Sequence, residues 1–234
     1  MTLPLSTRAD ALIELMDDPQ CDPQRLAATY RRFAVVNRLI SGWGAVYRRI
    51  LGPRLAALER PARVLDLGCG GGDLVVRLAE LAARDGLHAE WIGVDPDARA
   101  LEASRGRAYR GVEFRQATSS ELLASGERFD VVLSNHVIHH LSADDLTGFA
   151  ADSRALASDV VLHGDIARSH RAYALYTVGI TPIAPGTFLR TDGLRSIRRS
   201  YRLPELAAAL GGDWRIDTPA PFRLLAVAKG TARE

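Results

Sequence analysis

The residues best placed to do chemistry form a glycine-rich segment that begins with an acid. Asp66 stands two residues before the first of three alternating glycines, Gly68, Gly70 and Gly72, in an Asp-x-Gly-x-Gly-x-Gly pattern. Glycines in a turn between a strand and a helix let the backbone approach a ligand closely, because no Cβ intervenes. The helix that follows turns its positive N-terminal end toward the same ligand. We therefore expect a small ligand to bind at this turn.

The charge and spacing of the segment favour S-adenosylmethionine over a dinucleotide. A dinucleotide requires glycines spaced so that its pyrophosphate meets the helix N-terminus, typically as Gly-x-Gly-x-x-Gly. S-adenosylmethionine carries an ammonium and a sulfonium instead, so a carboxylate at Asp66 helps to bind it. Asp95 ends the next apolar run and can accept both ribose hydroxyl hydrogens, although it could also cap the following helix with Pro96 at its first position. Cys69 is expected to be a small residue tolerated in the loop, not a nucleophile.

Short apolar runs alternate with amphipathic stretches from residue 62 onward. Such alternation of continuously apolar strands with helices predicts a parallel sheet covered on both faces. The tail segments 213–218 and 222–228 also have strand patterns, and the connection between them is too short for a parallel crossover, so we expect an antiparallel pair. The runs interpreted as parallel strands are residues 64–67, 91–94, 112–114, 129–134 and 160–162.

The two segments outside this alternation are predicted to be helical. Leu12 to Met16 form a short apolar stripe that predicts a helix ended by Asp17, and apolar residues recur at three-to-four spacing between residues 30 and 50. Gly42 and Gly44 are expected to divide the latter into two helices. We therefore expect one structural domain. It would consist of an N-terminal helical lid segment over residues 1–60 and an α/β domain over 61–234 that contains a cap insertion at 166–203.

Three motifs resemble those of the class I S-adenosylmethionine-dependent methyltransferases: VLDLGCGGGDL at 64–74, GVDPD at 93–97 and FDVVLSNHVIHHL at 129–141. This resemblance implies a Rossmann-like, doubly wound α/β fold with a seven-stranded sheet that is mostly parallel with one antiparallel strand. It also implies S-adenosyl-L-homocysteine as product. Residues 30–51 and 193–210 are similar to flanking segments of the ubiquinone/menaquinone-biosynthesis methyltransferases, which act on apolar aromatic acceptors. The chain also resembles bacterial small-molecule methyltransferases found beside polyketide synthases.

The resemblance implies further contacts to the cofactor. The family often places an acid near the end of the third strand to bind the adenine amino group, whereas this chain has Ala117 and Thr118. Thr118 could contact the adenine or simply open a capping box with Glu121. Residues at the carboxyl ends of parallel strands line the ligand crevice, and Tyr30 could close over the cofactor from the N-terminal helix. The remaining expected contacts are Ser134, Asn135 and His136.

Four residues at the ends of the fourth and fifth strands are candidates for the catalytic base. A phenol has a pKa of about 10, so a neutral histidine that takes its proton would help at neutral pH. His139 and His140 are preferred, followed by His163 or Asp165, although His163 could equally be a buried structural histidine. His136 and His140 stand one helical turn apart, but we predict no metal because no carboxylate obviously converges on them.

Aromatic residues of the lid segment and the cap insertion could cover the acceptor, or could be ordinary core packing; they are Trp43, Tyr47, Tyr173, Tyr176 and Phe188. We predict O-methylation of a small apolar phenol, enol or hydroxypyrone of polyketide type, as in secondary metabolism, by in-line displacement with base assistance. C-methylation of a quinol precursor is the alternative within this class. Alternatives from other classes are a nicotinamide-dependent oxidoreductase and a non-catalytic cofactor-binding protein.

Composition restricts the partners. The 234 residues include 30 lysines and arginines against 28 aspartates and glutamates, a net charge of +2 that does not suit a polycationic nucleic-acid binder. No apolar run reaches the roughly 18 residues of a membrane span, and neither a signal peptide nor a cysteine framework is evident. We expect a cytoplasmic protein that acts on a small molecule, with no nucleic-acid partner. The oligomeric state stays open, with a homodimer among the alternatives.

Overall fold

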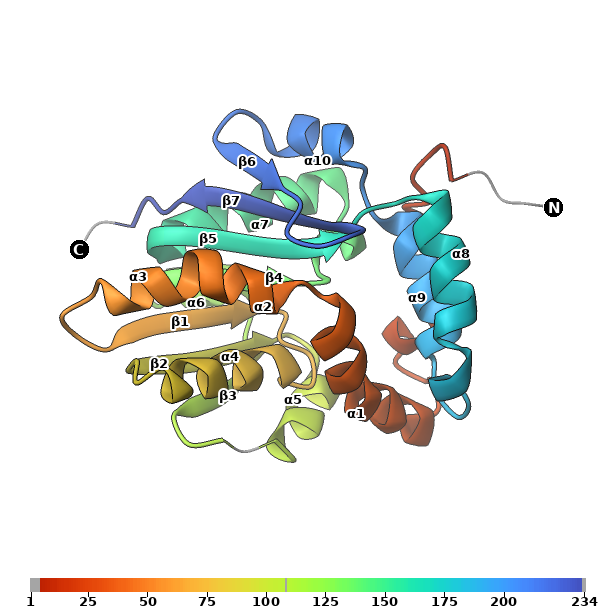
Figure 1. Ribbon diagram of the computed structural model, residues 1–234, viewed down its shortest axis with the longest axis horizontal. Coiled ribbons are helices and arrows are strands. Elements are labelled where there is room, and N and C mark those ends of the chain that lie inside the picture. The colour runs from red at the N-terminus through yellow and green to blue at the C-terminus, as the bar shows by residue number, and fades with distance from the viewer. Residues whose placement is uncertain (1–4, 108, 233–234) are drawn as a thin grey trace.

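One sheet of seven strands organises the computed structural model, which describes residues 5–107 and 109–232 (Figure 1). The strands lie in the order β3-β2-β1-β4-β5-β7-β6, with β1 to β5 parallel and β7 antiparallel to both of its neighbours. This arrangement confirms the predicted Rossmann-like sheet and its antiparallel tail. The strands are β1 (Ala62–Leu67), β2 (Ala89–Asp95), β3 (Val112–Gln116), β4 (Phe129–Asn135), β5 (Ala157–Ile166), β6 (Trp214–Asp217) and β7 (Arg223–Lys229). Residues 1–4, 108, 233 and 234 of the predicted segments lie outside the described residues.

Helices cover both faces of the sheet, as continuously apolar strands require. Alternate residues of a strand point to opposite faces, so Val64 packs on one side and Leu65 on the other, and both are fully buried. One face is covered by α2 (Trp43–Val46), α3 (Gly52–Ala56), α4 (Asp73–Arg84) and α5 (Ala98–Arg105). The other is covered by α6 (Ser119–Ala124), α7 (Ala143–Leu156) and α10 (Leu203–Leu210).

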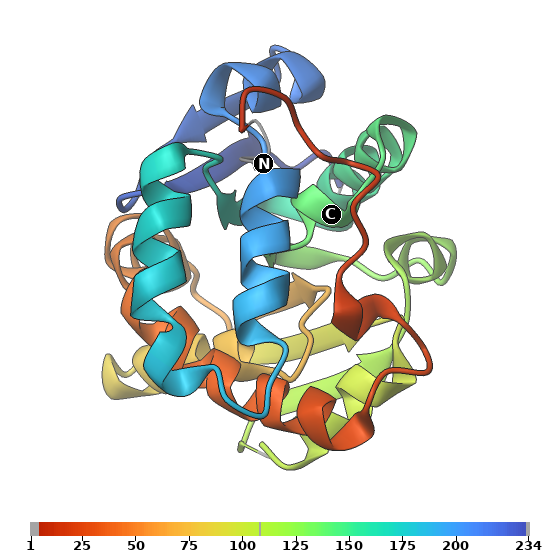
Figure 2. The same ribbon diagram turned by 90° about the vertical axis from the view of Figure 1, so that its right-hand side faces the viewer.

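Three further helices gather beyond the carboxyl ends of the parallel strands. They are α1 (Pro23–Ile40), α8 (His170–Gly179) and α9 (Leu189–Arg199), with the short turn η4 (Thr181–Ile183) between the last two. Figure 2 shows α8 and α9 side by side in front of the sheet, with α1 crossing below them. The insertion at 166–203 is therefore helical, as expected, and together with α1 it encloses the edge of the sheet where ligands bind in such folds.

The predicted helix over Leu12 to Met16 is wrong. Only a 3-10 turn forms there, η1 (Leu15–Asp17), and the chain before it runs alongside α9. The backbone N–H groups of Leu15 and Met16 donate to the Asp192 carboxylate at 2.8 and 3.0 Å, so a side chain of α9 takes bonds that a helix would otherwise make. The contact with Asp192 therefore prevents the helix that the short run of apolar residues predicted.

The predicted break after α1 occurs at Gly42, whose φ of 80° is left-handed, while Gly44 lies inside α2. A π-helical turn, η2 (Tyr47–Leu51), then joins α2 to α3. A glycine thus marks a boundary where its backbone conformation is needed, and not merely where it occurs in a helical pattern.

The contact between α8 and α9 depends on Gly193. A Cβ at this position would overlap the Tyr176 ring, whose hydroxyl donates to the Leu189 carbonyl at 2.7 Å. We predict that Gly193→Ala lowers the free energy of unfolding by about 1–3 kcal/mol, as overpacking does. Urea denaturation would measure this. Gly179→Ala in α8 is the matched control, since a Cβ there meets no atom within 4 Å. Equal effects of the two substitutions would contradict this packing role.

Candidate active site

The glycine-rich segment forms a tight turn that side chains could not occupy. Gly68, Gly70 and Gly72 have φ values of 70°, 53° and 75°, all left-handed. A Cβ at Gly68 would lie 2.5 Å from Val137, and one at Gly72 would lie 2.5 Å from the Phe114 ring. The conformation therefore favours glycine at all three positions, and the space also requires it at Gly68 and Gly72, which explains the alternating pattern in the sequence.

Three carboxylates surround this turn. Asp66 is 1% exposed, and neither of its side-chain oxygens has a hydrogen-bond partner in the described chain. Burial, together with the charges of Asp73 and Asp95, raises the pKa of Asp66 well above its usual range. Burial also raises the pKa values of Asp73 and Asp95. A buried acid without a partner beside two more acids suits a cationic ligand group and disfavours a pyrophosphate. The residues therefore fit S-adenosylmethionine.

Asp95 is held beside the turn by backbone groups. Its Oδ2 accepts the N–H of Gly70 and its Oδ1 accepts the N–H of Asp97, each at 2.9 Å. Each carboxylate oxygen keeps a lone pair for a further donor, so the predicted ribose contact is compatible with both bonds. The alternative in which Asp95 caps a helix with Pro96 first is wrong, because α5 begins at Ala98 and is capped by Asp97.

The remaining predicted cofactor residues differ in how they are placed. The Tyr30 ring packs against Gly71. Burial raises the pKa of the Cys69 thiol well above its usual range, which disfavours a role of Cys69 as a nucleophile. Ala117 and Thr118 follow β3, and the capping box of Thr118 with Glu121 is confirmed. Asn135 accepts a hydrogen bond from the Trp43 indole at 3.0 Å.

Ser134 is fully buried, and its hydroxyl bonds His163 Nδ1 at 2.8 Å. The contact to the methionine moiety predicted for Ser134 therefore has no support in its position.

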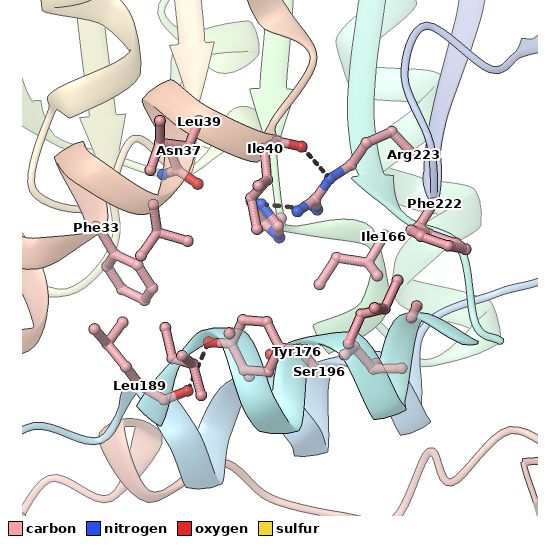
Figure 3. A pocket seen from close by; sticks show the side chains of 18 of the residues that line it. Phe33, Asn37, Leu39, Ile40, Ile166, Tyr176, Leu189, Ser196, Phe222 and Arg223 are labelled. Atoms are coloured by element: carbon pink, nitrogen blue, oxygen red, sulfur yellow. Dashed lines mark hydrogen bonds between the residues drawn. The ribbon is translucent and has the colours of Figure 1, made fainter. Parts of the chain in front are cut away.

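A cavity of about 530 Å³ lies between the lid helices and the edge of the sheet (Figure 3). Apolar side chains of α1, α8 and α9 form most of its wall, and polar groups enter it from these helices, from the strand ends and from the N-terminal segment. Such a cavity, largely apolar with a few convergent polar groups, is typical of a small-molecule site. The polar residues that line it are Glu14, Asn37, His136, Tyr176, Asp192, Ser196 and Arg223.

Of the aromatic residues predicted to cover the acceptor, Tyr176 alone lines this cavity. Trp43 is 1% exposed and packs against Gly164. The Tyr47 hydroxyl donates to Asp85 at 2.7 Å. The Phe188 ring lies under the Arg25 guanidinium, and Tyr173 packs with Ile166 and Ile197. These four residues do not line the cavity, and their positions favour the alternative of core packing.

His139 forms the centre of a buried ion cluster. Its Nδ1 lies 2.7 Å from Asp165 Oδ1, and its Nε2 lies 3.4 Å from Glu14 Oε1. Burial alone would lower the pKa of His139, but the Asp165 and Glu14 carboxylates raise it to about 9. Burial likewise opposes the ionised form of Asp165, yet the His139 charge holds the pKa of Asp165 at about 2. His139 is therefore protonated at neutral pH, and Asp165 is a weak base held in an ion pair, so neither suits the base that was predicted.

His163 and His140 lie outside the cavity wall. His163 is 1% exposed, stacked on Trp214 and close to Phe149, and burial lowers its pKa to about 3. The structural alternative stated for His163 is therefore the one that its position supports. The His140 Nδ1 lies 3.3 Å from Asp17 Oδ2, so it meets the N-terminal segment.

His136, which was predicted to border the methionine moiety of the cofactor, lines the cavity and was not among the predicted bases. It follows β4 with a left-handed φ of 63°, and its Nε2 lies 3.4 Å from Arg223 Nη1 at the cavity wall (Figure 3). Burial and the Arg223 charge hold the pKa of His136 well below its usual range. His136 is therefore neutral at physiological pH, and one of its two ring nitrogens carries no proton. The next residue, Val137, packs on Gly68, so this loop joins the cavity to the glycine turn.

Sequence reasoning missed Glu14 and Arg223. Glu14 belongs to a segment expected to be a free helix, and nothing local connects it to His139. Arg223 had a usable signal: because β7 is antiparallel to β5, its first residue lies at the edge where the parallel strands end.

The reason given against a metal is wrong, because carboxylates do converge on the histidines. Glu14 with His139 and His140, and His136 with His139 and Asp165, each bring ligand atoms within 4.8 Å of one another. His139 belongs to both groups and holds its proton between two carboxylates. That proton already supplies the positive charge which a cation would otherwise bring, and the absence of a metal stays a prediction.

Comparison with known proteins agrees with this geometry. Residues 64–159 match the model of a family described as methyltransferase domain. The chain is 29% identical over 163 residues to the ubiquinone biosynthesis O-methyltransferase of Mesorhizobium japonicum, an alignment covering 68% of this chain and 62% of that protein. A second such enzyme, from Azorhizobium caulinodans, is 35% identical over 120 residues, or 50% of this chain and 45% of that protein. The chain thus spans between about half and three fifths of the length of these relatives.

Solved structures share the fold. The CurJ carbon methyltransferase superposes with a TM-score of 0.62 at 16% identity, covering 91% of this chain and 62% of that one. The plantazolicin methyltransferase BpumL, solved with a desmethylPZN analog and SAH, gives a TM-score of 0.56 at 14% identity over 90% of this chain and 96% of that one. The sheet, the glycine turn and the matched segment 64–159 are similar to those of class I S-adenosylmethionine-dependent methyltransferase domains. Among the described residues, no helix has the length and apolarity to span a membrane.

The ion cluster predicts how stability depends on pH. The pKa of His139 is about 9 in the folded chain, against about 6.5 when unfolded, so folding is favoured by its proton. This stabilisation is complete below about pH 6.5 and disappears as the pH rises through 9. We predict that the wild type loses on the order of 3 kcal/mol of unfolding free energy between pH 6.5 and 9.5 relative to His139→Gln. Urea denaturation across this range measures the difference, and parallel pH profiles of the two proteins would contradict it.

Proposed function

We propose that the protein transfers a methyl group from S-adenosylmethionine to an ionisable oxygen of a small apolar acceptor held in the cavity. The observation that carries the proposal is the loop after β4. His136 lines the cavity, and the next residue packs on the glycine turn. An acceptor beside His136 would therefore lie next to the proposed cofactor site, as methyl transfer requires.

The cofactor part rests on the acids around the turn. Bound S-adenosylmethionine supplies a methyl group on a cationic sulfur. Asp66, with two unpartnered oxygens, would hold the ammonium, and Asp95 would accept bonds from the ribose hydroxyls. Asp73 adds a third negative charge, so the same acids disfavour the nicotinamide-dependent alternative, whose cofactor brings a pyrophosphate.

The acceptor part rests on the cavity and on His136. Apolar side chains from α1, α8 and α9 exclude water and suit a hydrocarbon body. The neutral imidazole of His136 would take the acceptor's proton before the attack; the acceptor oxygen would then bond the methyl carbon as the bond from that carbon to sulfur breaks, and S-adenosylhomocysteine leaves. Phenols, enols and hydroxypyrones of polyketide type fit this description. The relatives named as ubiquinone biosynthesis O-methyltransferases support transfer to oxygen.

C-methylation of a quinol precursor stays the second candidate, since a carbon nucleophile also needs a base. The likeness to CurJ, a carbon methyltransferase, favours it. Fragmentation of the methylated product by mass spectrometry separates the two, because an O-methyl group is lost with its oxygen.

Cofactor binding is tested by calorimetry with S-adenosylmethionine and, separately, NADH. We predict binding of the former, weakened at least tenfold in Asp95→Ala, because removal of a charged hydrogen-bond acceptor costs roughly 1.5–3 kcal/mol. Asp97→Ala is the matched control, since the Asp97 side chain caps α5 and accepts from Arg99, whereas Asp95 accepts the N–H of Gly70 in the turn. Binding of NADH, or equal affinities in the three proteins, would refute the cofactor assignment.

The base is tested with His136→Gln. We predict a fall in turnover of about 10²–10⁴-fold, because general-base assistance is lost, with the affinity for S-adenosylmethionine changed less than twofold. The measurement is transfer of labelled methyl to an acceptor found among alkylated phenols and hydroxypyrones. His170→Gln, an exposed histidine at the start of α8, should leave turnover unchanged. If His136→Gln keeps full turnover, another group is the base.

A further inference from the structure

Arg223 brings a buried positive charge to the cavity wall. It is the first residue of β7, it is 8% exposed, and it lines the cavity (Figure 3). Its Nε donates to the Ile40 carbonyl at 2.7 Å, and its Nη1 lies 3.4 Å from His136 Nε2. A guanidinium has five N–H donors, so most of its donors are not used by these contacts.

No carboxylate among the described residues forms an ion pair with Arg223, although acids lie near. Asp165 acts on it electrostatically, but both Asp165 oxygens are engaged by His139, and one also accepts the Ile166 N–H at 2.7 Å. Glu14 pairs with His139, and Asp192 accepts two backbone N–H groups. Burial lowers the pKa of Arg223 to about 10, which leaves it charged at neutral pH. A charge buried without a counterion is costly unless a ligand supplies one.

Backbone strain marks the same place. His136 and Phe222, with φ values of 63° and 59°, are the two non-glycine residues of the described chain in the left-handed region. One carries the imidazole, and the other immediately precedes the arginine. Such strain persists where the surrounding structure enforces it, and it is concentrated at functional sites. The fold therefore holds both side chains at the cavity against a local cost.

We propose that Arg223 is the receptor for an oxyanion of the acceptor, so that the substrates are phenols or enols bound in their ionised form. This inference rests on the proposed function and deepens it. A neutral phenol or enol that enters the cavity gives its proton to His136, and the oxyanion that forms lies against the guanidinium. Arg223 is then a specificity-determining residue: it selects acidic oxygens and rejects amines and neutral ethers of the same shape.

The test uses 4-nitrophenol, whose ionised form absorbs at a longer wavelength than its neutral form. With wild-type protein in excess, we expect the absorbance of the bound probe to titrate about one pH unit below that of the free probe, a tenfold preference for the anion. In Arg223→Met the apolar cavity should instead raise the midpoint above the free value, because burial disfavours the charge. Arg223→Lys should lie between them. Arg171→Met, at an exposed arginine of α8, should behave as the wild type.

Two outcomes would overturn the proposal: failure of the wild type to prefer the ionised probe, or the same preference in Arg223→Met. Circular dichroism verifies that the variants fold. If Arg223→Met does not fold, the wild type is compared with 4-nitroanisole, a neutral isostere that should bind at least tenfold more weakly at a pH where the phenol is ionised. Titration of S-adenosylmethionine is done on the same samples. A preserved anion preference without cofactor binding would refute the proposed function and leave the anion site standing.

Discussion

The cavity depends on one buried cation, the imidazolium of His139 between Asp165 and Glu14. These three residues come from the loop after β4, from the end of β5 and from the N-terminal segment, which are remote in sequence. Glu14 also accepts from Ser196 of α9, so the cluster fixes a lid helix as well. Removal of His139 would leave two buried carboxylates without a cation, which is why this residue holds the three elements together. The wall that faces the acceptor is built on these attachments.

This arrangement divides the histidines into different roles by their surroundings alone. His139 lies between two carboxylates and keeps its proton, whereas His163 packs between aromatic rings and stays neutral. His136 lies beside Arg223 at the cavity wall and is neutral as well. The acids follow the same logic: Asp165 is neutralised by a histidine, whereas Asp66 has no partner within the chain. The groups left without a counterpart, Asp66 at the turn and Arg223 in the cavity, are the ones that we assign to ligands. Their opposite charges match a cationic cofactor and an anionic acceptor.

The sheet and the glycine turn could be predicted because their signals are local. Apolar runs, a strand-turn-helix context and an acid at the end of β2 all lie within short stretches, and Gly68 to Gly72 adopt the conformations that glycine allows. The choice among the histidines could not be predicted, because the protonation of His139 depends on Glu14. Glu14 is far away in the sequence and lies in a segment that was misread as a helix. The role of the aromatic residues stayed open as well, because the sequence patterns of Trp43 and Tyr47 suit a core and a pocket equally. Contacts between residues that are remote in sequence decide both which histidine keeps its proton and which aromatic side chains belong to the core.

The most direct test of the account is the titration of the individual histidines by nuclear magnetic resonance of ring nitrogens. The account predicts that His139 stays protonated through pH 8 and titrates near 9, whereas His136 is neutral at every pH above its usual range. Assignment follows from His139→Gln and His136→Gln, each of which removes one signal. A neutral His139 at pH 7, or a His136 that titrates above pH 7, would contradict the division of roles on which both the cavity and the proposed base depend.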